Sequence, residues 1–220
     1  MTPKKFKERK IRIQKLDRVL KKLFPTVTTE LVYRMPWQMM VAVQLSAQCT
    51  DKLVNRVTKE LFKKYKMLDD YVRAKPAEFE KMIHSCTYSF NKTRNILAAA
   101  KFVKKEFKGK LPKTITEMVR IPGVGRKTAN VVLAEIYDIS EGVTVDTHVI
   151  RFCSRFDLSD HRDATKIERD LMTLLPKKEW PHFTHRVIHY GRYMAPARKH
   201  DNSKDPLVKI YPPAANKFRV

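Results

Sequence analysis

The sequence IPGVGRKTANVVL, residues Ile121 to Leu133, decides the fold of this chain. A Pro-Gly-x-Gly turn joins two amphipathic segments, and Lys127 stands one residue after the start of the second segment. Glycines at Gly123 and Gly125 permit positive φ angles and expose backbone N–H groups, which is how a short turn holds a phosphate. The stretch therefore predicts two helices joined by an anion-binding turn, with a lysine beside it.

Two nucleotide-binding motifs are excluded for this turn. A Walker A loop requires glycine directly before Lys-Ser or Lys-Thr, whereas Arg126 occupies that position. The strand that precedes both a Walker A loop and a Rossmann fingerprint is also missing. The remaining alternative is a glycine-rich connection between helices whose lysine is only solvated.

The composition indicates a polyanionic partner. The 220 residues include 46 Lys and Arg against 23 Asp and Glu, a formal net charge of +23. This excess is far larger than solubility requires, and nucleic acid is the commonest partner of such proteins. A membrane surface is disfavoured because no apolar run of about 18 residues is present. RNA is disfavoured because no aromatic stacking platform stands out.

The cysteines and the first residues indicate an intracellular protein. Cys49, Cys86 and Cys153 are odd in number and widely spaced, so they form neither a disulfide framework nor a CxxC metal pattern. The opening MTPKKFKERKIRIQK is a basic helical arm without the apolar segment of a secretory signal.

The spacing of apolar residues predicts a mainly α-helical chain. Helices are expected to include Leu16 to Phe24, Trp37 to Ala47, a segment capped by Asp51, Asn91 to Phe107, Thr114 to Arg120, Arg126 to Tyr137, Asp163 to Leu175 and His182 to Tyr193. Val143 to Val145 is the one stretch that could form a strand. From Ala195 onward, prolines and charges predict a tail that wraps the surface without regular structure.

A second segment, VDTHVIRFCSRF from Val145 to Phe156, places Asp146 directly before a helical pattern. By itself this aspartate is an N-cap, since Asp is among the preferred capping residues. Capping does not exclude chemistry, and the pairing of Asp146 with Lys127 in one chain raises the functional interpretation.

Together these segments resemble a known family. LSAQCTDKLVNRV (Leu45 to Val57), IPGVGRKTANVVL and VDTHVIRFCSR stand in the order and at the intervals found in the endonuclease III-like DNA glycosylases/AP lyases of the helix-hairpin-helix (HhH-GPD) superfamily. HYGRYMAPARK, from His189 to Lys199, adds a further similarity.

The resemblance implies an all-α fold of two lobes with a DNA-binding cleft between them. Residues 30–140 would form a helical barrel that contains the helix-hairpin-helix at about 114–137. Residues 1–29 and 141–220 would form a second helical domain with a basic tail.

The resemblance also implies a bifunctional enzyme of base excision repair. Such enzymes flip a damaged base out of the duplex, because its glycosidic bond is inaccessible inside the stack. Lys127 matches the amine that attacks the sugar, forms a Schiff base and nicks the strand by β-elimination. Burial, the helix N terminus and Arg126 are expected to favour the neutral amine. Asp146 matches the carboxylate that stabilises charge developing on the sugar.

The implied partner is double-stranded DNA that contains damaged bases, with oxidised pyrimidines as the family default, or abasic sites. We expect a monomer that does not bind membranes, and a monovalent cation at the hairpin. The matching DNA-contact residues are Gln48, Tyr88, Gly123, Val124, Gly125, Arg126, Thr128, His148 and Arg192. Gln48 would fill the space left by the flipped nucleotide, although a polar residue at a helix end is its alternative role. Asp51 is expected to be a structural cap and His148 to be a supporting residue.

The chain departs from the family at two places. Ala195, Asn202 and Asp205 stand where the first three cysteines of a [4Fe–4S] cluster are expected, so no cluster is predicted. Thr87 replaces the glycine before the intercalating wedge, which leaves Tyr88 or Ser89 as the wedge. Tyr88 would alternatively belong to the core.

Other activities of the same fold are alternatives. Mismatch uracil or thymine glycosylases and adenine glycosylases usually have a residue other than lysine at the nucleophile position, so Lys127 disfavours them. A non-catalytic helix-hairpin-helix protein is disfavoured because both Lys127 and Asp146 are present.

Overall fold

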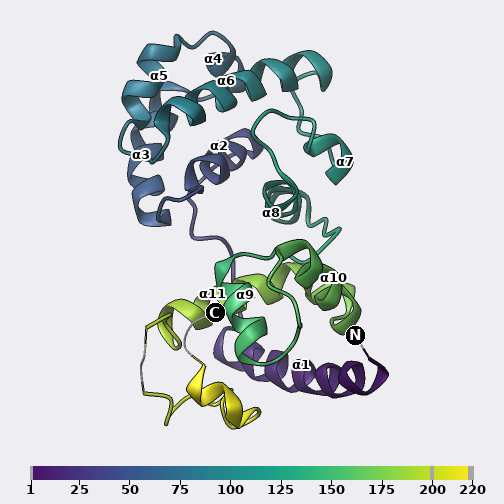
Figure 1. Ribbon diagram of the computed structural model, residues 1–220. Helices are drawn as coiled ribbons and strands as arrows, with labels where there is room; N and C mark the ends of the chain where they lie inside the picture. The colour runs from purple at the N-terminus through teal and green to yellow at the C-terminus, as the bar shows by residue number, and fades with distance from the viewer. Residues whose placement is uncertain (1, 199–200, 218–220) are drawn as a thin grey trace. The chain divides into compact units, whose positions relative to one another are not determined.

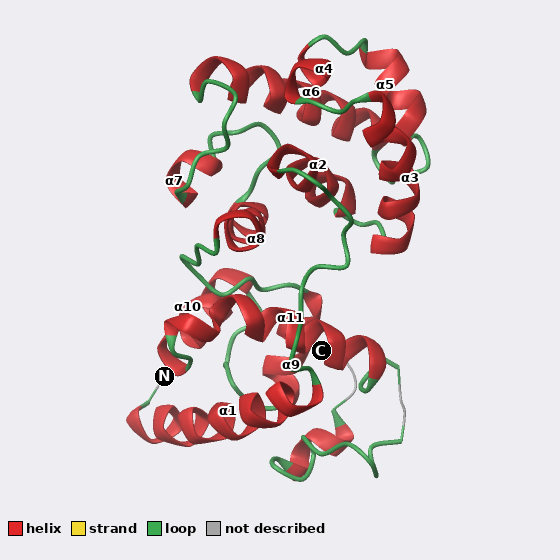
Figure 2. Cartoon of the chain, turned by 180° about the vertical axis from the view of Figure 1, so that it is seen from behind, coloured by secondary structure: helices red, strands yellow, loops and turns green. Residues whose placement is uncertain are grey.

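The computed structural model describes residues 2–198 and 201–217. Across those residues the regular elements are helices and no strand occurs (Figure 2), which confirms the all-α prediction. Val143 and Val145 lie buried in a loop instead of a strand. A lone extended segment has no partner for a ladder of hydrogen bonds, so it packs as a loop. None of the described helices combines the length and the apolar character needed to cross a membrane.

The chain divides into two compact units, which are described separately (Figure 1). We call Thr29–Ile139 the hairpin unit, and Met1–Thr28 together with Ser140–Val220 the terminal unit. The sequence boundaries expected at residues 30 and 140 lie within one residue of this division.

The hairpin unit is built from helices packed around one apolar core. They are α2 (Pro36–Ser46), α3 (Asp51–Lys64), α4 (Leu68–Val72), α5 (Pro76–Ile83), α6 (Ser89–Glu106), α7 (Ile115–Met118) and α8 (Arg126–Tyr137). As the periodicity predicts, α6 buries one face, which includes Ile96, Ala100 and Val103, against α4 and α5. Helix α2 packs against α3 and α8.

Two elements of this unit escaped the sequence prediction. Helices α4 and α5 have five and eight residues, too few for apolar residues to repeat over several turns. They contribute Tyr71 and Phe79, whose ring centroids lie 5.8 Å apart in the core. The predicted cap of α3 is also wrong by one residue. Thr50 is the N-cap and accepts a hydrogen bond from the Leu53 N–H, while Asp51 is the first helical residue.

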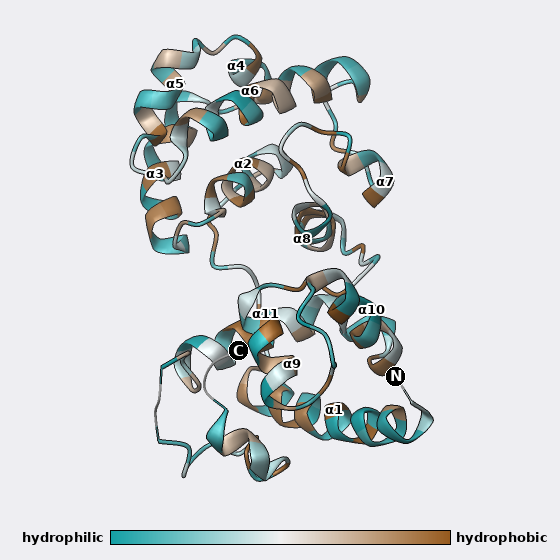
Figure 3. Cartoon of the chain, viewed as in Figure 1, coloured by the Kyte–Doolittle hydropathy of each residue, from teal (hydrophilic) through white to brown (hydrophobic). Residues whose placement is uncertain are grey.

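The terminal unit joins the two ends of the chain in a second core. Its elements are α1 (Pro3–Leu23), α9 (Thr147–Arg155), α10 (Ala164–Leu174), the 3-10 helix η1 (Lys177–Glu179), α11 (Trp180–Tyr193) and the 3-10 helix η2 (Pro212–Asn216). Helix α1 alternates between hydrophilic and hydrophobic residues along its length (Figure 3) and packs its apolar side against α10 and α11. The N-terminal basic arm is therefore part of a folded core.

A buried arginine fastens α1 to the loop after α9. Arg9 is only 1% exposed, and its Nη2 donates to Asp157 Oδ1 at 2.6 Å and to Asp160 Oδ1 at 2.7 Å. Its Nε donates to the Asp157 carbonyl at 3.1 Å. A buried guanidinium is tolerated only when its donors are satisfied, and here carboxylates satisfy them.

The prediction of a tail without regular structure beyond Ala195 is wrong in part. Helix η2 forms there, and Leu207 and Ala214 are fully buried against the terminal core. Prolines and charges obscured these apolar positions because they are isolated in the sequence. Lys199, in the basic segment of the tail, lies outside the described residues.

Arg155, at the end of α9, ties this tail to the core. Its Nε donates to the Ala214 carbonyl at 3.0 Å, its Nη1 to the Tyr190 hydroxyl at 2.9 Å and its Nη2 to Asn202 Oδ1 at 2.6 Å. Asp205 accepts from both Tyr190 and Arg155. Burial and the hydrogen bond to Asp205 raise the pKa of Tyr190, so its hydroxyl keeps the proton that it donates.

Replacing Arg9 with methionine should lower the free energy of unfolding by about 2 kcal/mol at neutral pH, because two partly exposed carboxylates lose charge-assisted hydrogen bonds. Hydrogen bonds from Arg9 and then from Lys5 hold the pKa of Asp160 well below its ordinary value of 3.8. A lowered pKa stabilises the folded state above the unfolded value, and this contribution is lost as the pH falls below 3.8. Urea unfolding across this pH range measures the effect.

The matched control is Lys7→Met, which removes an exposed cation from the same helix. Its stability should stay close to that of the wild type at every pH. If the difference in free energy of unfolding between wild type and Arg9→Met stays the same in acid, the carboxylates that bind Arg9 do not stabilise the fold as proposed.

Candidate active site

The turn between α7 and α8 depends on a glycine. Gly123 has a φ angle of +75°, and a Cβ at this position would lie 2.8 Å from the Cβ of Asn95 on α6. Both the backbone conformation and the close approach of α6 therefore require glycine. Gly125 differs from the prediction, because it has a φ angle of −89° and forms the N-cap of α8.

Backbone donors gather where α8 begins. No side chain caps this helix, so its first N–H groups lack the usual side-chain acceptor. The Val124 N–H donates to the Ile121 carbonyl at 3.0 Å and is used inside the turn. This leaves Gly123 and Gly125 as the turn's candidate donors to an anion, which is the arrangement that binds phosphate at helix starts.

Lys127 is the second residue of α8, and its side chain is exposed. The expectation that the apolar helix buries Lys127 is wrong. The residues that α8 buries include Ala129, Val132 and Leu133, and a helix turns by about 100° per residue, so these lie on a different face from Lys127. Arg126 is exposed beside it, and Thr128 is half-buried.

Asp146 caps α9, as its position before the helical pattern predicts. Its Oδ1 accepts a hydrogen bond from the Val149 N–H at 2.9 Å. This bond fixes the carboxylate at the start of α9 and employs one of its two oxygens. The side chain is half-buried, so the carboxylate is both held in place and partly accessible.

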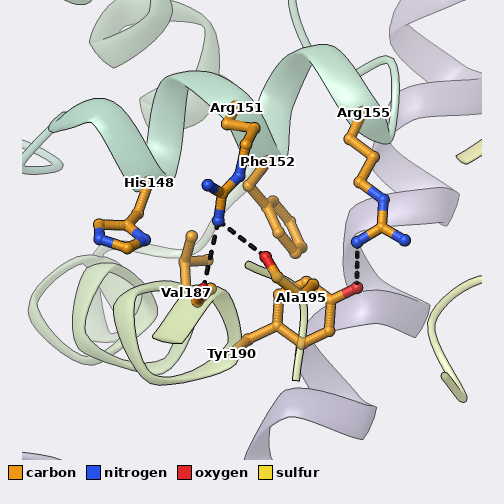
Figure 4. A pocket seen from close by; sticks show the side chains of 8 residues that line it. His148, Arg151, Phe152, Arg155, Val187, Tyr190 and Ala195 are labelled. Carbon is orange, nitrogen blue, oxygen red and sulfur yellow. Dashed lines mark hydrogen bonds between the residues drawn. The ribbon is translucent and has the colours of Figure 1, made fainter. Parts of the chain in front are cut away.

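His148 lies in a close contact between α9 and α11 (Figure 4). A Cβ at Gly191 would lie 2.4 Å from His148 Nδ1 and 2.8 Å from Arg151 Nη2, so only glycine fits there. Arg151 donates to the Gly191 carbonyl at 3.3 Å and to the Ala195 carbonyl at 2.8 Å. His148 is thereby part of the packing that joins the two helices, and its supporting role toward DNA stays a prediction.

The cavity lined by His148, Arg151 and Gly191 has a volume of about 10 Å³. A cavity of this size holds about one water molecule and is too small for a nucleobase. Arg192 follows Gly191 on α11 and is exposed, so the same helix presents a cation at the surface.

Two exposed turns of the hairpin unit lie side by side. Gln48, between α2 and α3, and Tyr88, at the start of α6, have left-handed φ angles of 55° and 60°. The Thr87 hydroxyl donates to the Gln48 carbonyl at 3.2 Å and joins the two turns. Tyr88 is 59% exposed, which excludes the alternative that it is a core residue.

A buried lysine donates hydrogen bonds to the backbone next to these turns. Lys92, in the second turn of α6, is only 7% exposed. Its Nζ donates to the Leu45 carbonyl at 2.8 Å and the Ala47 carbonyl at 2.7 Å, and it lies 3.3 Å from Cys49 Sγ. All three ammonium donors therefore have acceptors, which is the condition for burying a lysine.

Sequence reasoning missed two residues of this region. Phe90 is 65% exposed and stands next to Tyr88 and Ser89. The sequence could have indicated its exposure. Residues on one helix face are three, four or seven positions apart, and Phe90 is at none of these spacings from Ile96, which lies on the apolar face of α6. Ser89 instead is half-buried and donates to Glu80. Lys92 gave no signal, since a lysine in a helix is usually solvated.

Helix α6 connects two turns of the hairpin unit that carry predicted residues. Its first turns carry Tyr88 and Lys92, and Asn95 lies beneath Gly123 of the turn that precedes Lys127. Asp146, His148 and Arg192 belong to the terminal unit. The DNA-contact roles of these residues remain predictions.

The tail does not provide the ligands of an iron–sulfur cluster. Ala195, Asn202 and Asp205 stand at the expected cysteine positions. Asn202 and Asp205 are already committed to Arg155, and an amide and a carboxylate are poor substitutes for thiolates on iron. In the described part of the chain, no group of three or more His, Cys, Asp or Glu residues is arranged to hold a metal ion.

Comparison with known proteins agrees with this arrangement. The model of the family described as HhH-GPD superfamily base excision DNA repair protein matches residues 41–177. Endonuclease III of Synechocystis sp. is 43% identical over 89% of this chain and 90% of its own length. Endonuclease III of Bacillus subtilis is 40% identical over 86% of each chain.

Solved structures give the same result. A non-covalent endonuclease III–DNA complex has a TM-score of 0.86 and 38% identity, and covers 91% of this chain and 94% of the solved one. A trapped endonuclease III–DNA covalent intermediate has a TM-score of 0.89 and 37% identity, and covers 96% and 99%. A thermostable thymine-DNA glycosylase, at 18% identity and a TM-score of 0.79, shares the fold. This chain therefore belongs to the HhH-GPD superfamily of base excision DNA repair proteins.

Proposed function

We propose that this protein is a bifunctional DNA glycosylase and AP lyase that acts on damaged bases and abasic sites in double-stranded DNA. The observation that carries the proposal is Lys127, an exposed amine on the first turn of α8 beside the anion-binding turn. The relatives named endonuclease III and the trapped covalent DNA intermediate of one such protein support covalent chemistry of this kind.

In the proposed reaction, Lys127 Nζ attacks C1′ of a flipped nucleotide and the damaged base leaves. The resulting Schiff base undergoes β-elimination, which breaks the strand on the 3′ side. Asp146 stabilises the positive charge that develops on the sugar and assists the proton transfers. Lys127 is exposed in the protein alone, so the bound duplex excludes water from its amine.

The exposed turns of the hairpin unit supply the contacts that flipping requires. Gln48 fills the space left by the nucleotide, and Tyr88 intercalates as the wedge. The amides of Gly123 and Gly125 hold a backbone phosphate together with a monovalent cation. The net charge of +23 adds the sequence-independent attraction that holds a duplex.

Further parts of the proposal follow from the family. The substrates are oxidised pyrimidines, and the protein works as a monomer inside the cell, associated with DNA. Arg126, Thr128, His148 and Arg192 contribute contacts to the DNA backbone or support them. Lysine at the nucleophile position favours this activity over that of mismatch or adenine glycosylases, which usually have another residue there. The presence of this lysine also disfavours a non-catalytic protein.

We also propose that the protein holds no [4Fe–4S] cluster. The support is the chemistry of the tail, where Arg155 organises Asn202, Asp205 and the Ala214 carbonyl around one guanidinium. These hydrogen bonds brace the segment that cysteine–iron bonds would otherwise hold.

Replacing Lys127 with glutamine should abolish both strand nicking at an abasic site and the adduct that borohydride traps, because no amine remains to form the Schiff base. The protein is incubated with borohydride and with duplexes that each carry a different lesion. The amount of trapped adduct then ranks the substrates. The matched control is Arg126→Gln, which removes the neighbouring exposed cation and should weaken binding without removing the adduct. Nicking by Lys127→Gln at the wild-type rate would refute the mechanism.

Replacing Asp146 with asparagine should slow base removal by about 10²–10⁴-fold. Asparagine caps helices about as well as aspartate, so α9 should remain folded and only the charge is lost. Single-turnover kinetics measure the rate, and thermal melting monitors the fold. Asp146→Ala provides the comparison, since it loses the cap as well as the charge. Equal rates for wild type and Asp146→Asn would exclude the proposed role.

Replacing Arg155 with methionine should destabilise the terminal unit by about 3–5 kcal/mol, because Asp205 would be left buried without its cation. Limited proteolysis should then cut the tail between Pro196 and Lys217. Arg155→Lys keeps the charge without the planar fork and should be intermediate. Iron analysis of the pure wild-type protein accompanies the test, and stoichiometric iron would overturn the proposal.

A further inference from the structure

Two cysteines flank the exposed turns of the hairpin unit. Cys49 directly follows Gln48, and Cys86 directly precedes Thr87, the residue whose hydroxyl joins the turns. Because the Thr87 hydroxyl donates to the Gln48 carbonyl at 3.2 Å, the two cysteines flank one contact between the turns, and both belong to the same apolar core. Cys86 is buried and Cys49 is half-buried, so one member of the pair is accessible from solvent.

The surroundings of the two thiols differ. Burial raises the pKa of Cys49, but hydrogen bonds from Thr87 and Lys92 outweigh it, so the net shift is downward. Burial, followed by the charge of Cys49, raises the pKa of Cys86 to about 11. The Lys92 ammonium, 3.3 Å from the Cys49 sulfur, favours the thiolate form of Cys49, and burial disfavours the thiolate form of Cys86.

We propose that Cys49 is a peroxide-reactive modification site and that Cys86 is its resolving thiol. Accessibility, an adjacent cation and a nearby second thiol are the three features of a redox-sensing cysteine. The third cysteine, Cys153, lies fully buried in the terminal unit and is not accessible from solvent. Burial also raises its pKa, which makes it an internal control.

The chemistry needs one hydroperoxide, such as hydrogen peroxide, as the oxidant. The Cys49 thiolate attacks a peroxide oxygen, the O–O bond breaks, and sulfenic acid and hydroxide form. Cys86 sulfur then attacks the sulfenic sulfur, an S–S bond forms, and the S–O bond breaks. The hydroxyl leaves as water with the Cys86 proton. Two thiols lose two electrons in total, and the peroxide is reduced to two waters.

A bond between Cys49 and Cys86 would act directly on the two turns. It would draw the Cys49 sulfur away from Lys92 and link the turns of Gln48 and Tyr88 covalently. If these turns enter the duplex, which rests on the proposed function, the link would restrict their adjustment to DNA. We expect the catalytic efficiency of base removal to fall by about tenfold in the oxidised protein.

The first test reads the bond itself and does not depend on activity. The full-length reduced protein is treated with hydrogen peroxide, alkylated with N-ethylmaleimide, digested without reductant and analysed by mass spectrometry. We expect a cross-linked peptide pair that contains Cys49 and Cys86, an alkylated Cys153, and reversal by dithiothreitol. A Cys49 that remains a free thiol, or a Cys153 that reacts equally in the folded protein, would overturn the proposal.

Variants separate the two steps. Cys86→Ser should stop at the sulfenic acid, which dimedone labels at Cys49, whereas Cys49→Ser should not be labelled. Lys92→Met should slow alkylation of Cys49, and Lys101→Met, an exposed lysine of the same helix, should not. Since Lys92→Met removes a buried support, the dimedone result with Cys86→Ser decides the outcome if that variant fails to fold.

The last measurement compares base removal by the reduced and oxidised wild type, with oxidised Cys86→Ser as a control that cannot form the link. If the rate of base removal falls only when the disulfide forms, and returns with dithiothreitol, the disulfide regulates activity. An unchanged rate of base removal in the disulfide-linked protein would overturn this regulation of activity. A reduced protein without any glycosylase activity would instead count against the proposed function, and the cross-linked peptide would still be measured.

Discussion

The buried ammonium of Lys92 is the interaction on which the hairpin unit's candidate site depends. A helix ends with carbonyl groups that have no partner within the helix, and the end of α2 meets this difficulty inside the protein. Lys92 supplies donors to the Leu45 and Ala47 carbonyls, where the negative end of the helix dipole also favours a cation. The turn that follows can then adopt the left-handed conformation of Gln48 without leaving buried acceptors unsatisfied.

The same helix connects this support to the hairpin. Lys92 and Asn95 are three residues apart on α6 and therefore lie on neighbouring positions of one face. Asn95 packs against Gly123 so closely that no side chain fits between them. A displacement of α6 would consequently affect the Gln48 turn, the Tyr88 turn and the anion-binding turn together. One helix thus holds three short loops in a defined arrangement within one unit.

The terminal unit relies on a different device, the buried guanidinium. Arg9 joins the first helix to the loop that contains Asp157, and Arg155 joins α9 to η2 in the tail. A guanidinium has five donors in a planar fork, so one side chain can hydrogen-bond several acceptors from different segments. In the tail, which has polar residues where the resemblance expects cysteines, the Arg155 guanidinium hydrogen-bonds Asn202 and Asp205.

The sequence by itself determined the helical class, most helix positions, the motif around Lys127 and the capping role of Asp146, because these depend on residues close together in the chain. Only the tertiary structure decided that Lys127 is exposed and that Tyr88 is outside the core. It also revealed Lys92, Arg155 and the pairing of Cys49 with Cys86, whose partners are 35 to 59 residues away in the chain. Local periodicity specifies a helix and its apolar face, but burial of a charge or a thiol depends on what other segments place against it.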